Sequence, residues 1–499
     1  MKNIAILSTS LNSGGAERIA GLLSKELAKY YNVFLFLLDT ERIVYEYGGE
    51  IVDIGDELPF FEHRVAAEKK LKHIDISISF MEIMNFANIR TRGTDKVIIS
   101  ERCVQSLFQP SLDAQTIKIR KYYGSADAIV ACSHGVKYDL LTNYSIKNEI
   151  DVIYNFINKE KIRKLSEEDL PESVETFLNG ASLFLNVARL HPQKNQISIL
   201  NAFEQYLDSN KNCKLIFLGS GELEEKINEE ISNRKLNDFV KVVPYDSNPF
   251  RYMKRAKTII LASRFEGLPN AVLETMTIGC PIIATDCLAG PRELLGDYTD
   301  YSEQFGNGIS VLDRGILLSY YHSNNELDIK LLIEAMRYVN DNQQAVDDMK
   351  RQQQAYMNEY SNAIIVGKWI DLIENIEGNR RIKHEEATGY DSRKKTFIYG
   401  MGMVGTATFL SIREKIPIDG FVVSRKEEAV SDYMGIPVYD VKSIPYANEE
   451  SQFILGTIEN TQDELVRELY RNGYSNIVMP YVTPSEESMA FVKNYRGEK

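Results

Sequence analysis

Several features are scarce or missing in this 499-residue chain, and each absence excludes a class of protein. The five cysteines form no Cys-x-x-Cys pair, which argues against a disulfide framework or a zinc site and favours reduced core thiols. No run of about 18 apolar residues occurs, so the sequence predicts no membrane-spanning helix. The net charge of −13 argues against a general nucleic-acid binder.

The N-terminus has a short apolar run broken by polar residues, unlike a signal peptide. We therefore expect a cytoplasmic protein. Any membrane contact would be peripheral, at the inner face of the plasma membrane.

Short apolar runs alternate with helix-like segments along most of the chain, as in β-α-β units on a parallel sheet. "NIAILSTS" leads into "GGAERIAGLLSKELAKY", and the rhythm restarts at "SLFLNVARL". The pattern predicts an α/β fold with two Rossmann-like domains, a linker and a small Rossmann-like domain, at residues 1–165, 166–376, 377–394 and 395–499. An amphipathic helix over 361–376 is expected to close the second domain.

The stretch "RFEGLPNAVLETM" follows a buried strand and turns into a helix near Pro269. The first helical N–H groups are expected to be unpaired and to form an anion site at the positive end of the helix. Gly267 is expected to let the backbone approach a ligand. Glu266 and Glu274 flank this anion site, and carboxylates accept hydrogen bonds from sugar hydroxyls. The N–H donors are those of Asn270, Ala271 and Val272.

Two cations follow an upstream strand in "NVARLHPQKNQ". The carboxyl ends of parallel strands face one ligand crevice, so Arg189 and Lys194 are expected to point into it and bind phosphate. Gly219, in "LGSGE", permits a tight turn toward the same rim. The whole layout suits a nucleotide sugar, whereas a lone pair of glutamates eight residues apart would more often be ordinary surface acids.

Taken together, "ARLHPQKN", "GSGE", "SRFEGLPNAVLETM" and "ATDCLAGPREL" resemble the family-4 group of retaining glycosyltransferases, the glycosyl transferases group 1. The resemblance spans roughly residues 1–376. It implies a GT-B fold, with two facing Rossmann-like domains and the active site between them. It also implies that Glu266 contacts the transferred sugar, that Glu274 binds the ribose, and that Arg189 and Lys194 hold the diphosphate.

The family also has a glycine pair near the donor, and Gly14 and Gly15 match it. Many members carry a His-Asp pair after a strand in the middle of this domain. This chain instead reads "KVIISERC", which puts that catalytic histidine in doubt. Two interpretations of Glu101 and Arg102 are open: they face the acceptor, or they form an ion pair at the domain rim.

By analogy with the family, the acceptor is expected to be a hydroxyl-bearing glycan on a lipid carrier. Two basic stretches, "AAEKKLKH" and "TIKIRKYYG", fit either an anionic membrane surface or a solvated helix face, and we prefer the latter.

The expected reaction is metal-independent transfer of a sugar from a nucleotide sugar to a hydroxyl group, with no cofactor. The chain contains no Asp-x-Asp, the usual carboxylate clamp for a divalent metal, so cationic side chains would stabilise the leaving diphosphate. Two alternatives are a nucleotide-sugar epimerase with the GT-B fold and a non-catalytic scaffold subunit that binds nucleotide.

The small third domain contains a G-x-G-x-x-G sequence between a strand and a helix, formed by Gly400, Gly402 and Gly405. The context is that of a dinucleotide-binding fingerprint. Asp419, however, precedes the next strand instead of ending it, so the acidic ribose ligand is missing or displaced. A structural role and a nucleotide-binding role are both open for this domain.

Overall fold

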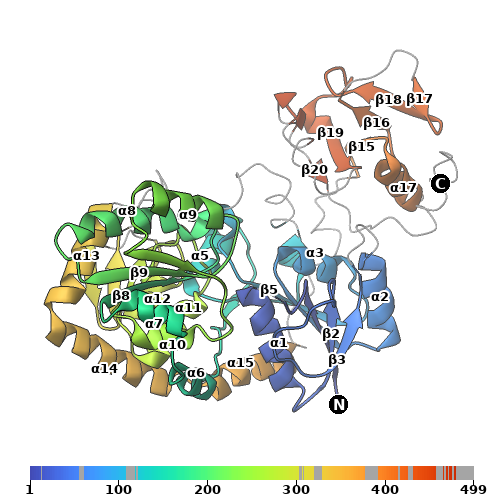
Figure 1. The fold of residues 1–499 in the computed structure, drawn as a ribbon. Coiled ribbons are helices and arrows are strands. Elements are labelled where there is room, and N and C mark those ends of the chain that lie inside the picture. Colours follow the sequence, from blue (N-terminus) through green and yellow to red (C-terminus); the bar gives the residue numbers. More distant parts are fainter. Residues whose placement is uncertain are drawn as a thin grey trace.

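The structure is a computed structural model, and it describes most of the chain. The described residues are 1–12, 14–55, 61–107, 119, 122–302, 306, 308–319, 329–376, 392–413, 416–424, 431–456, 465, 468–469, 471–474 and 477–478. Three α/β domains are seen, each built on its own sheet (Figure 1).

The N-terminal domain has a parallel sheet in the order β3-β2-β1-β4-β5-β6-β7. The strands are β1 (Asn3–Ser8), β2 (Asn32–Leu37), β3 (Glu50–Asp53), β4 (Ile76–Phe80), β5 (Lys96–Glu101), β6 (Ala128–Ala131) and β7 (Ile150–Val152). The α-helices are α1 (Gly15–Leu27), α2 (Phe61–Leu71), α3 (Glu82–Arg90) and α5 (His134–Thr142). Helices cover both faces of the sheet, so nearly all residues of the central strands β1, β4, β5 and β6 are buried.

The central domain repeats this plan in the order β10-β9-β8-β11-β12-β14-β13, with β13 antiparallel at the edge. The strands are β8 (Ser182–Val187), β9 (Cys213–Leu218), β10 (Val240–Val243), β11 (Thr258–Leu261), β12 (Ile282–Thr285), β13 (Ile309–Leu312) and β14 (Gly315–Leu318). The α-helices are α6 (Lys159–Ser166), α7 (Glu172–Leu178), α8 (Gln196–Leu207), α9 (Glu224–Asn233), α10 (Phe250–Arg255), α11 (Asn270–Ile278), α12 (Pro291–Gly296), α13 (Ile329–Asp341) and α14 (Gln343–Glu359). The boundary expected near residue 165 falls inside α6, which packs against α10 and α11.

The C-terminal domain has the strand order β17-β18-β16-β15-β19-β20, with β17 antiparallel to β18. Its elements are β15 (Lys395–Tyr399), α17 (Met403–Ile412), β16 (Gly420–Val423), β17 (Asp432–Tyr433), β18 (Ile436–Asp440), β19 (Ser451–Leu455) and β20 (Ile477–Val478). In all three sheets the strand order reverses beside the first strand of the domain. Ligands of doubly wound sheets bind at such a switch point, outside the carboxyl ends of the strands.

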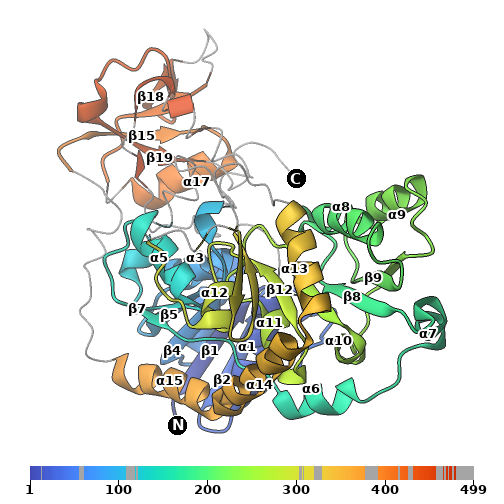
Figure 2. The ribbon, with the colours of Figure 1, turned by 90° about the vertical axis from the view of Figure 1, so that its left-hand side faces the viewer.

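Helix α15 (Asn362–Asn375) ends the two-domain part of the chain, and it does not close the central domain as the sequence predicted. After α14 the chain crosses back, and α15 packs beside α1 of the N-terminal domain (Figures 1 and 2). Trp369 is 1% exposed, and its ring centroid lies 6.2 Å from that of Phe80 at the end of β4. Near the helix end, Glu374 accepts hydrogen bonds from Lys2 Nζ at 2.8 Å and Tyr31 Oη at 2.6 Å. The amphipathic pattern predicted the helix, but its partner depends on the path of the chain.

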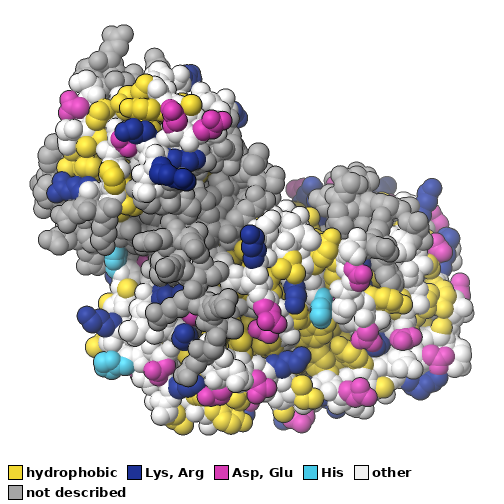
Figure 3. Space-filling view, turned by 180° about the vertical axis from the view of Figure 1, so that it is seen from behind, with side chains coloured by type: hydrophobic (Ala, Val, Ile, Leu, Met, Phe, Trp, Pro, Cys, Tyr) yellow, Lys and Arg dark blue, Asp and Glu magenta, His cyan; other side chains and the backbone are white. Residues whose placement is uncertain are grey.

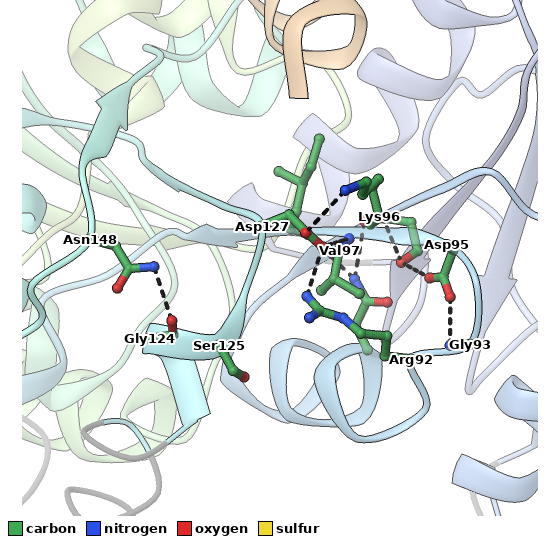
Figure 4. A network of polar contacts seen from close by, with 12 residues as sticks. Arg92, Gly93, Asp95, Lys96, Val97, Gly124, Ser125, Asp127 and Asn148 are labelled. Carbon is green, nitrogen blue, oxygen red and sulfur yellow. Dashed lines mark hydrogen bonds and ion pairs between the residues drawn. The ribbon is translucent and has the colours of Figure 1, made fainter. Parts of the chain in front are cut away.

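A buried polar network stabilises the amino-terminal edge of the first sheet (Figure 4). Asp127 accepts hydrogen bonds from Arg92 Nη2 and from the Val97 amide, both at 2.8 Å. Asp95 accepts one from Lys69 Nζ at 2.9 Å, and burial lowers the pKa of Lys69 to about 8. The network lies at the edge where β5 begins, opposite the edge that faces the candidate site, so we assign it to stability.

Candidate active site

The loops after β8 and β11 bring Lys194 and Glu266 together. Lys194 Nζ lies 2.5 Å from Glu266 Oε1, and the side chains are 20% and 9% exposed. Two further hydrogen bonds join these loops, from Arg264 N to Gln193 O and from Gln193 Nε2 to Phe265 O, both at 2.8 Å. A cation and a carboxylate that are 72 residues apart in sequence therefore share one fixed position at the carboxyl edge of the central sheet.

Arg189 lies on the same rim, two residues after the end of β8, but it does not join this pair. Its side chain is exposed, and no described residue forms a hydrogen bond or ion pair with its guanidinium group. Gly219 directly follows the next strand, β9, and a Cβ atom added there would overlap the carbonyl oxygen of Ala188. The rim thus has one cation held by a carboxylate and one that extends into solvent.

Helix α11 begins at Asn270, directly after Pro269, as the sequence indicated. One expectation was wrong: the Val272 amide is not free, because it donates to the Pro269 carbonyl at 3.0 Å. The amides of Asn270 and Ala271 have no acceptor among the described residues. The positive end of the helix therefore offers two backbone donors beside Glu266, fewer than expected.

Gly267 permits a close approach of its backbone to a neighbouring group, but that group belongs to the protein and not to a ligand. A Cβ atom at this position would overlap the carbonyl oxygen of Arg102 in the N-terminal domain and lie 3.0 Å from Cys132 Sγ. The glycine was expected to make room for a ligand. Here it lets the loop before α11 pack directly on the opposite domain.

The N-terminal domain reaches the start of α11 through the loop after β1. Gly14 has φ of 95°, a conformation that suits glycine, and a Cβ atom added at Gly15 would lie 3.2 Å from Asn270 Nδ2. One turn further along each helix, Arg18 Nη1 lies 2.5 Å from Glu274 Oε1. Helices α1 and α11 therefore meet across the domain boundary near their N-termini. The two glycines and Glu274 were predicted from the sequence, whereas Arg18 was not.

One interpretation, an ion pair between Glu101 and Arg102, is wrong, whereas a role of Arg102 toward the acceptor stays a prediction. Glu101 is 1% exposed and accepts hydrogen bonds from Tyr123 Oη at 2.7 Å and from Gln105 Nε2 and Arg102 N at 3.0 Å. Burial raises the pKa of Glu101 to about 7. The described contacts include no side-chain ion pair between Glu101 and Arg102. Glu101 thus lies in the core behind the cleft surface.

A chain of polar side chains links Arg102 to α11. The Arg102 guanidinium group donates to Ser100 Oγ at 3.3 Å and to Asn155 Oδ1. Asn155, which is 4% exposed, donates in turn to Leu268 O at 3.1 Å and to Asn270 Oδ1 at 2.7 Å. Asn155 was not predicted, because its partners before and in α11 lie more than 100 residues away in sequence.

Glu293 forms a further contact between the two domains. It is 1% exposed and accepts four hydrogen bonds. The backbone amides of His134 and Gly135 each donate at 2.9 Å, and the hydroxyls of Tyr154 and Tyr301 each donate at 2.8 Å. Because α5 begins at His134, the carboxylate of the central domain caps a helix of the N-terminal domain.

Two lysines of the first basic stretch form ion pairs within the protein. In the first stretch, Lys69 is 5% exposed and paired with Asp95, and Lys72 Nζ lies 2.6 Å from Glu50 Oε1. In the second stretch, residues 116–118 and 120–121 lie outside the described residues. On the face in Figure 3, Lys and Arg side chains are interspersed with Asp and Glu side chains. No described helix is both long and apolar enough to span a membrane.

In the C-terminal domain the glycine-rich turn is tight. A Cβ atom added at Gly405 would overlap the carbonyl oxygen of Gly400, whereas nothing lies near such an atom at Gly402. Asp419 accepts hydrogen bonds from Lys395 Nζ and Thr396 N, both at 2.9 Å, at the start of β15. The acid therefore lies at the edge of the sheet opposite the glycines. No group of three or more metal-ligating side chains is found among the residues described in any domain.

Residues 172–311 match the family model "Glycosyl transferases group 1". A Campylobacter jejuni protein named N-acetylgalactosamine-N,N'-diacetylbacillosaminyl-diphospho-undecaprenol 4-alpha-N-acetylgalactosaminyltransferase is 27% identical over 333 residues, which cover 62% of this chain and 87% of that protein. Together these matches support a group 1 glycosyltransferase. This glycosyltransferase is also 33% identical, over 175 residues, to an uncharacterized glycosyltransferase of Methanocaldococcus jannaschii. That match covers 35% of the chain and 43% of the relative.

The solved structures support the fold of this glycosyltransferase. The crystal structure of Anabaena HepE in complex with UDP-glucose superposes with a TM-score of 0.57 at 15% identity, and the match covers 75% of this chain and 99% of that one. The likeness shows a GT-B fold, in which two Rossmann-like domains face each other.

Proposed function

We propose that this glycosyltransferase moves a hexosyl group from a nucleotide sugar to a hydroxyl group of a lipid-linked glycan, with retention of anomeric configuration and without a metal ion. The observation that carries the proposal is the contact between Lys194 and Glu266 beside the start of α11. It joins a cation for phosphate and an acid for sugar hydroxyls at the sheet edge where ligands of this fold class bind.

The donor would lie along this edge with its diphosphate at the two free amides of α11. Lys194, and Arg189 on the rim, would stabilise the charge that develops on the diphosphate. Glu266 would accept hydrogen bonds from hydroxyls of the transferred sugar, and Glu274 from those of the ribose. Arg189 is exposed and has no partner among the described residues, so its side chain could move onto a bound phosphate.

The transfer step follows from this placement. The bond between the anomeric carbon and the diphosphate oxygen breaks, and its electron pair goes to the diphosphate. The acceptor oxygen then bonds to the same face of the carbon, and its proton passes to a diphosphate oxygen. Glu101 is 1% exposed, so it does not serve as a nucleophile on the opposite face.

The acceptor class is supported by the Campylobacter relative, whose name specifies a diphospho-undecaprenol-linked substrate. The protein would then act in the cytoplasm at the inner face of the plasma membrane. The Anabaena structure contains UDP-glucose, so UDP-sugars are the first donors to test.

The test is transfer of labelled sugar from UDP-, GDP- and dTDP-sugars to undecaprenyl-diphosphate-linked glycans, with EDTA present. We expect Lys194→Ala to lower kcat by about 10²- to 10³-fold with the fold intact. Lys211→Ala, which removes an exposed lysine, is the matched control and should keep wild-type turnover. Wild-type turnover of Lys194→Ala would refute the proposal. Sugar isomerisation without an acceptor would identify an epimerase, and nucleotide binding without turnover would identify a scaffold.

A further inference from the structure

Arg18 comes from the N-terminal domain but contacts an acid of the central domain. It lies one turn into α1, and its Nη1 atom is 2.5 Å from Glu274 Oε1. The two side chains are 26% and 8% exposed, so the pair is largely shielded from water on the acid's side. Burial at this level makes the contact stronger than an ordinary surface ion pair.

The contact leaves half of the Glu274 carboxylate available. Arg18 occupies Oε1, and no group among the described residues donates to Oε2. Glu266 shows the same pattern, because Lys194 occupies its Oε1 atom alone. An ionised carboxylate has about four acceptor positions, so each acid is fixed by one cation and retains capacity for ligand hydroxyls.

The identity of the cation matters at this position. A guanidinium group stays protonated at any relevant pH, so the Glu274 carboxylate always faces a cation here. The orientation of Glu274 also depends on the N-terminal domain, since α1 and α11 meet there through Gly15 and Asn270. The acid is therefore set in place only when the two domains are docked.

We propose that Arg18 is a positioning residue for the donor ribose, which acts by holding the Glu274 carboxylate toward the ribose hydroxyls. The inference rests on the proposed function. It makes selectivity for a ribonucleotide a property of both domains, because the acid comes from one domain and the group that orients it comes from the other. A bridge that only held the domains together would affect every ligand of the cleft equally.

The experiment measures binding of UDP, GDP, their 2′-deoxy counterparts and inorganic pyrophosphate by calorimetry. The full-length proteins are the wild type, Arg18→Ala, Arg18→Lys and the control Lys25→Ala. Lys25 lies on the same helix, where it pairs at 2.7 Å with Glu46, a partly exposed residue on the surface of the same domain.

We expect the wild type to bind its preferred ribonucleotide about 10-fold more tightly than the deoxy form, as for one hydrogen bond to a charged group. Arg18→Ala should lose most of this ratio, and Arg18→Lys should keep part of it. Pyrophosphate has no ribose, so its affinity should change by less than about 2-fold. Lys25→Ala should behave as the wild type.

The possible failures are distinguishable. If the wild type binds no nucleotide, the proposed function is wrong and this inference falls with it. If the wild type discriminates and Arg18→Ala discriminates equally, only the role of Arg18 is refuted. Equal loss of pyrophosphate and UDP binding in both Arg18 variants would show a general effect on the cleft and would also refute it. Additive effects of Arg18→Ala and Glu274→Ala on UDP affinity would also refute the role of Arg18. If Arg18 acts through the Glu274 carboxylate, the effects of the two substitutions must be coupled.

Discussion

Glu293→Gln is a sensitive test of how the two large domains are held together. Each carboxylate oxygen accepts one backbone N–H and one tyrosine hydroxyl: Oε1 from Gly135 and Tyr301, and Oε2 from His134 and Tyr154. Glutamine has the same shape but replaces one of these oxygens with an NH₂ group. A tyrosine hydroxyl can rotate and accept from that group, but a backbone N–H cannot. One backbone amide, either that of Gly135, which is buried, or that of His134, which is partly buried, therefore loses its acceptor.

The size of the effect follows from that count. An unsatisfied buried donor costs about 1–3 kcal/mol, and removing a negative charge from the N-terminus of α5 costs about 0.3–1 kcal/mol. We therefore expect Glu293→Gln to lower the free energy of unfolding by about 2–3 kcal/mol. Relaxation is restricted because a Cβ atom at Gly135 would already lie 2.6 Å from Ala289 Cα.

The assay is urea unfolding followed by the fluorescence of Trp369, the single tryptophan of the chain. This residue is buried against Phe80, so its emission reports the packing of α15 on the N-terminal domain. Glu229→Gln, at an exposed position of α9, is the matched control and should change the free energy by less than about 0.5 kcal/mol. If Glu293→Gln unfolds at the same urea concentration as this control, the hydrogen-bonding account of the interface is refuted.

Two further predictions concern residues near the cleft. Burial raises the pKa of Glu101 from 4.5 to about 7, so this group lowers the free energy of unfolding by up to about 3 kcal/mol as the pH rises through that range. Glutamine does not titrate, so the stability of Glu101→Gln relative to the wild type, measured by urea unfolding, should increase with pH. If the free energies of unfolding of the two proteins run parallel with pH, the raised pKa of Glu101 is contradicted. Gly267→Ala should destabilise the protein by about 1–3 kcal/mol and lower kcat, because the new methyl group overlaps the Arg102 carbonyl. Wild-type stability and turnover in that variant would show that the two domains are not in contact there.

The sequence predicted those parts of the site that depend on local structure. Lys194 and Glu266 each follow a strand of one parallel sheet, and the carboxyl ends of such strands meet at one edge. The start of α11 was predicted from Pro269. The hydrogen bond from the Val272 amide to the Pro269 carbonyl was not predicted, because a tightened first turn has no signature in the sequence.

The contacts between domains could not be predicted in this way. Arg18, Asn155 and Glu293 act on partners more than 100 residues away, and those partners are defined only once the domains dock. Arg18 did carry a signal, since it lies three residues after Gly15 on the same helix. That spacing shows on which face of α1 Arg18 lies, but it does not show which residues this face contacts.

The return of the chain through α15 has a consequence for synthesis in the cell. The helix that covers Phe80 of the N-terminal domain is encoded almost 300 residues after it. At about 5–20 residues per second, a ribosome takes on the order of tens of seconds to cover that distance. Through that interval the part of the N-terminal domain that α15 covers is exposed. This apolar surface is available to chaperones until α15 leaves the ribosome.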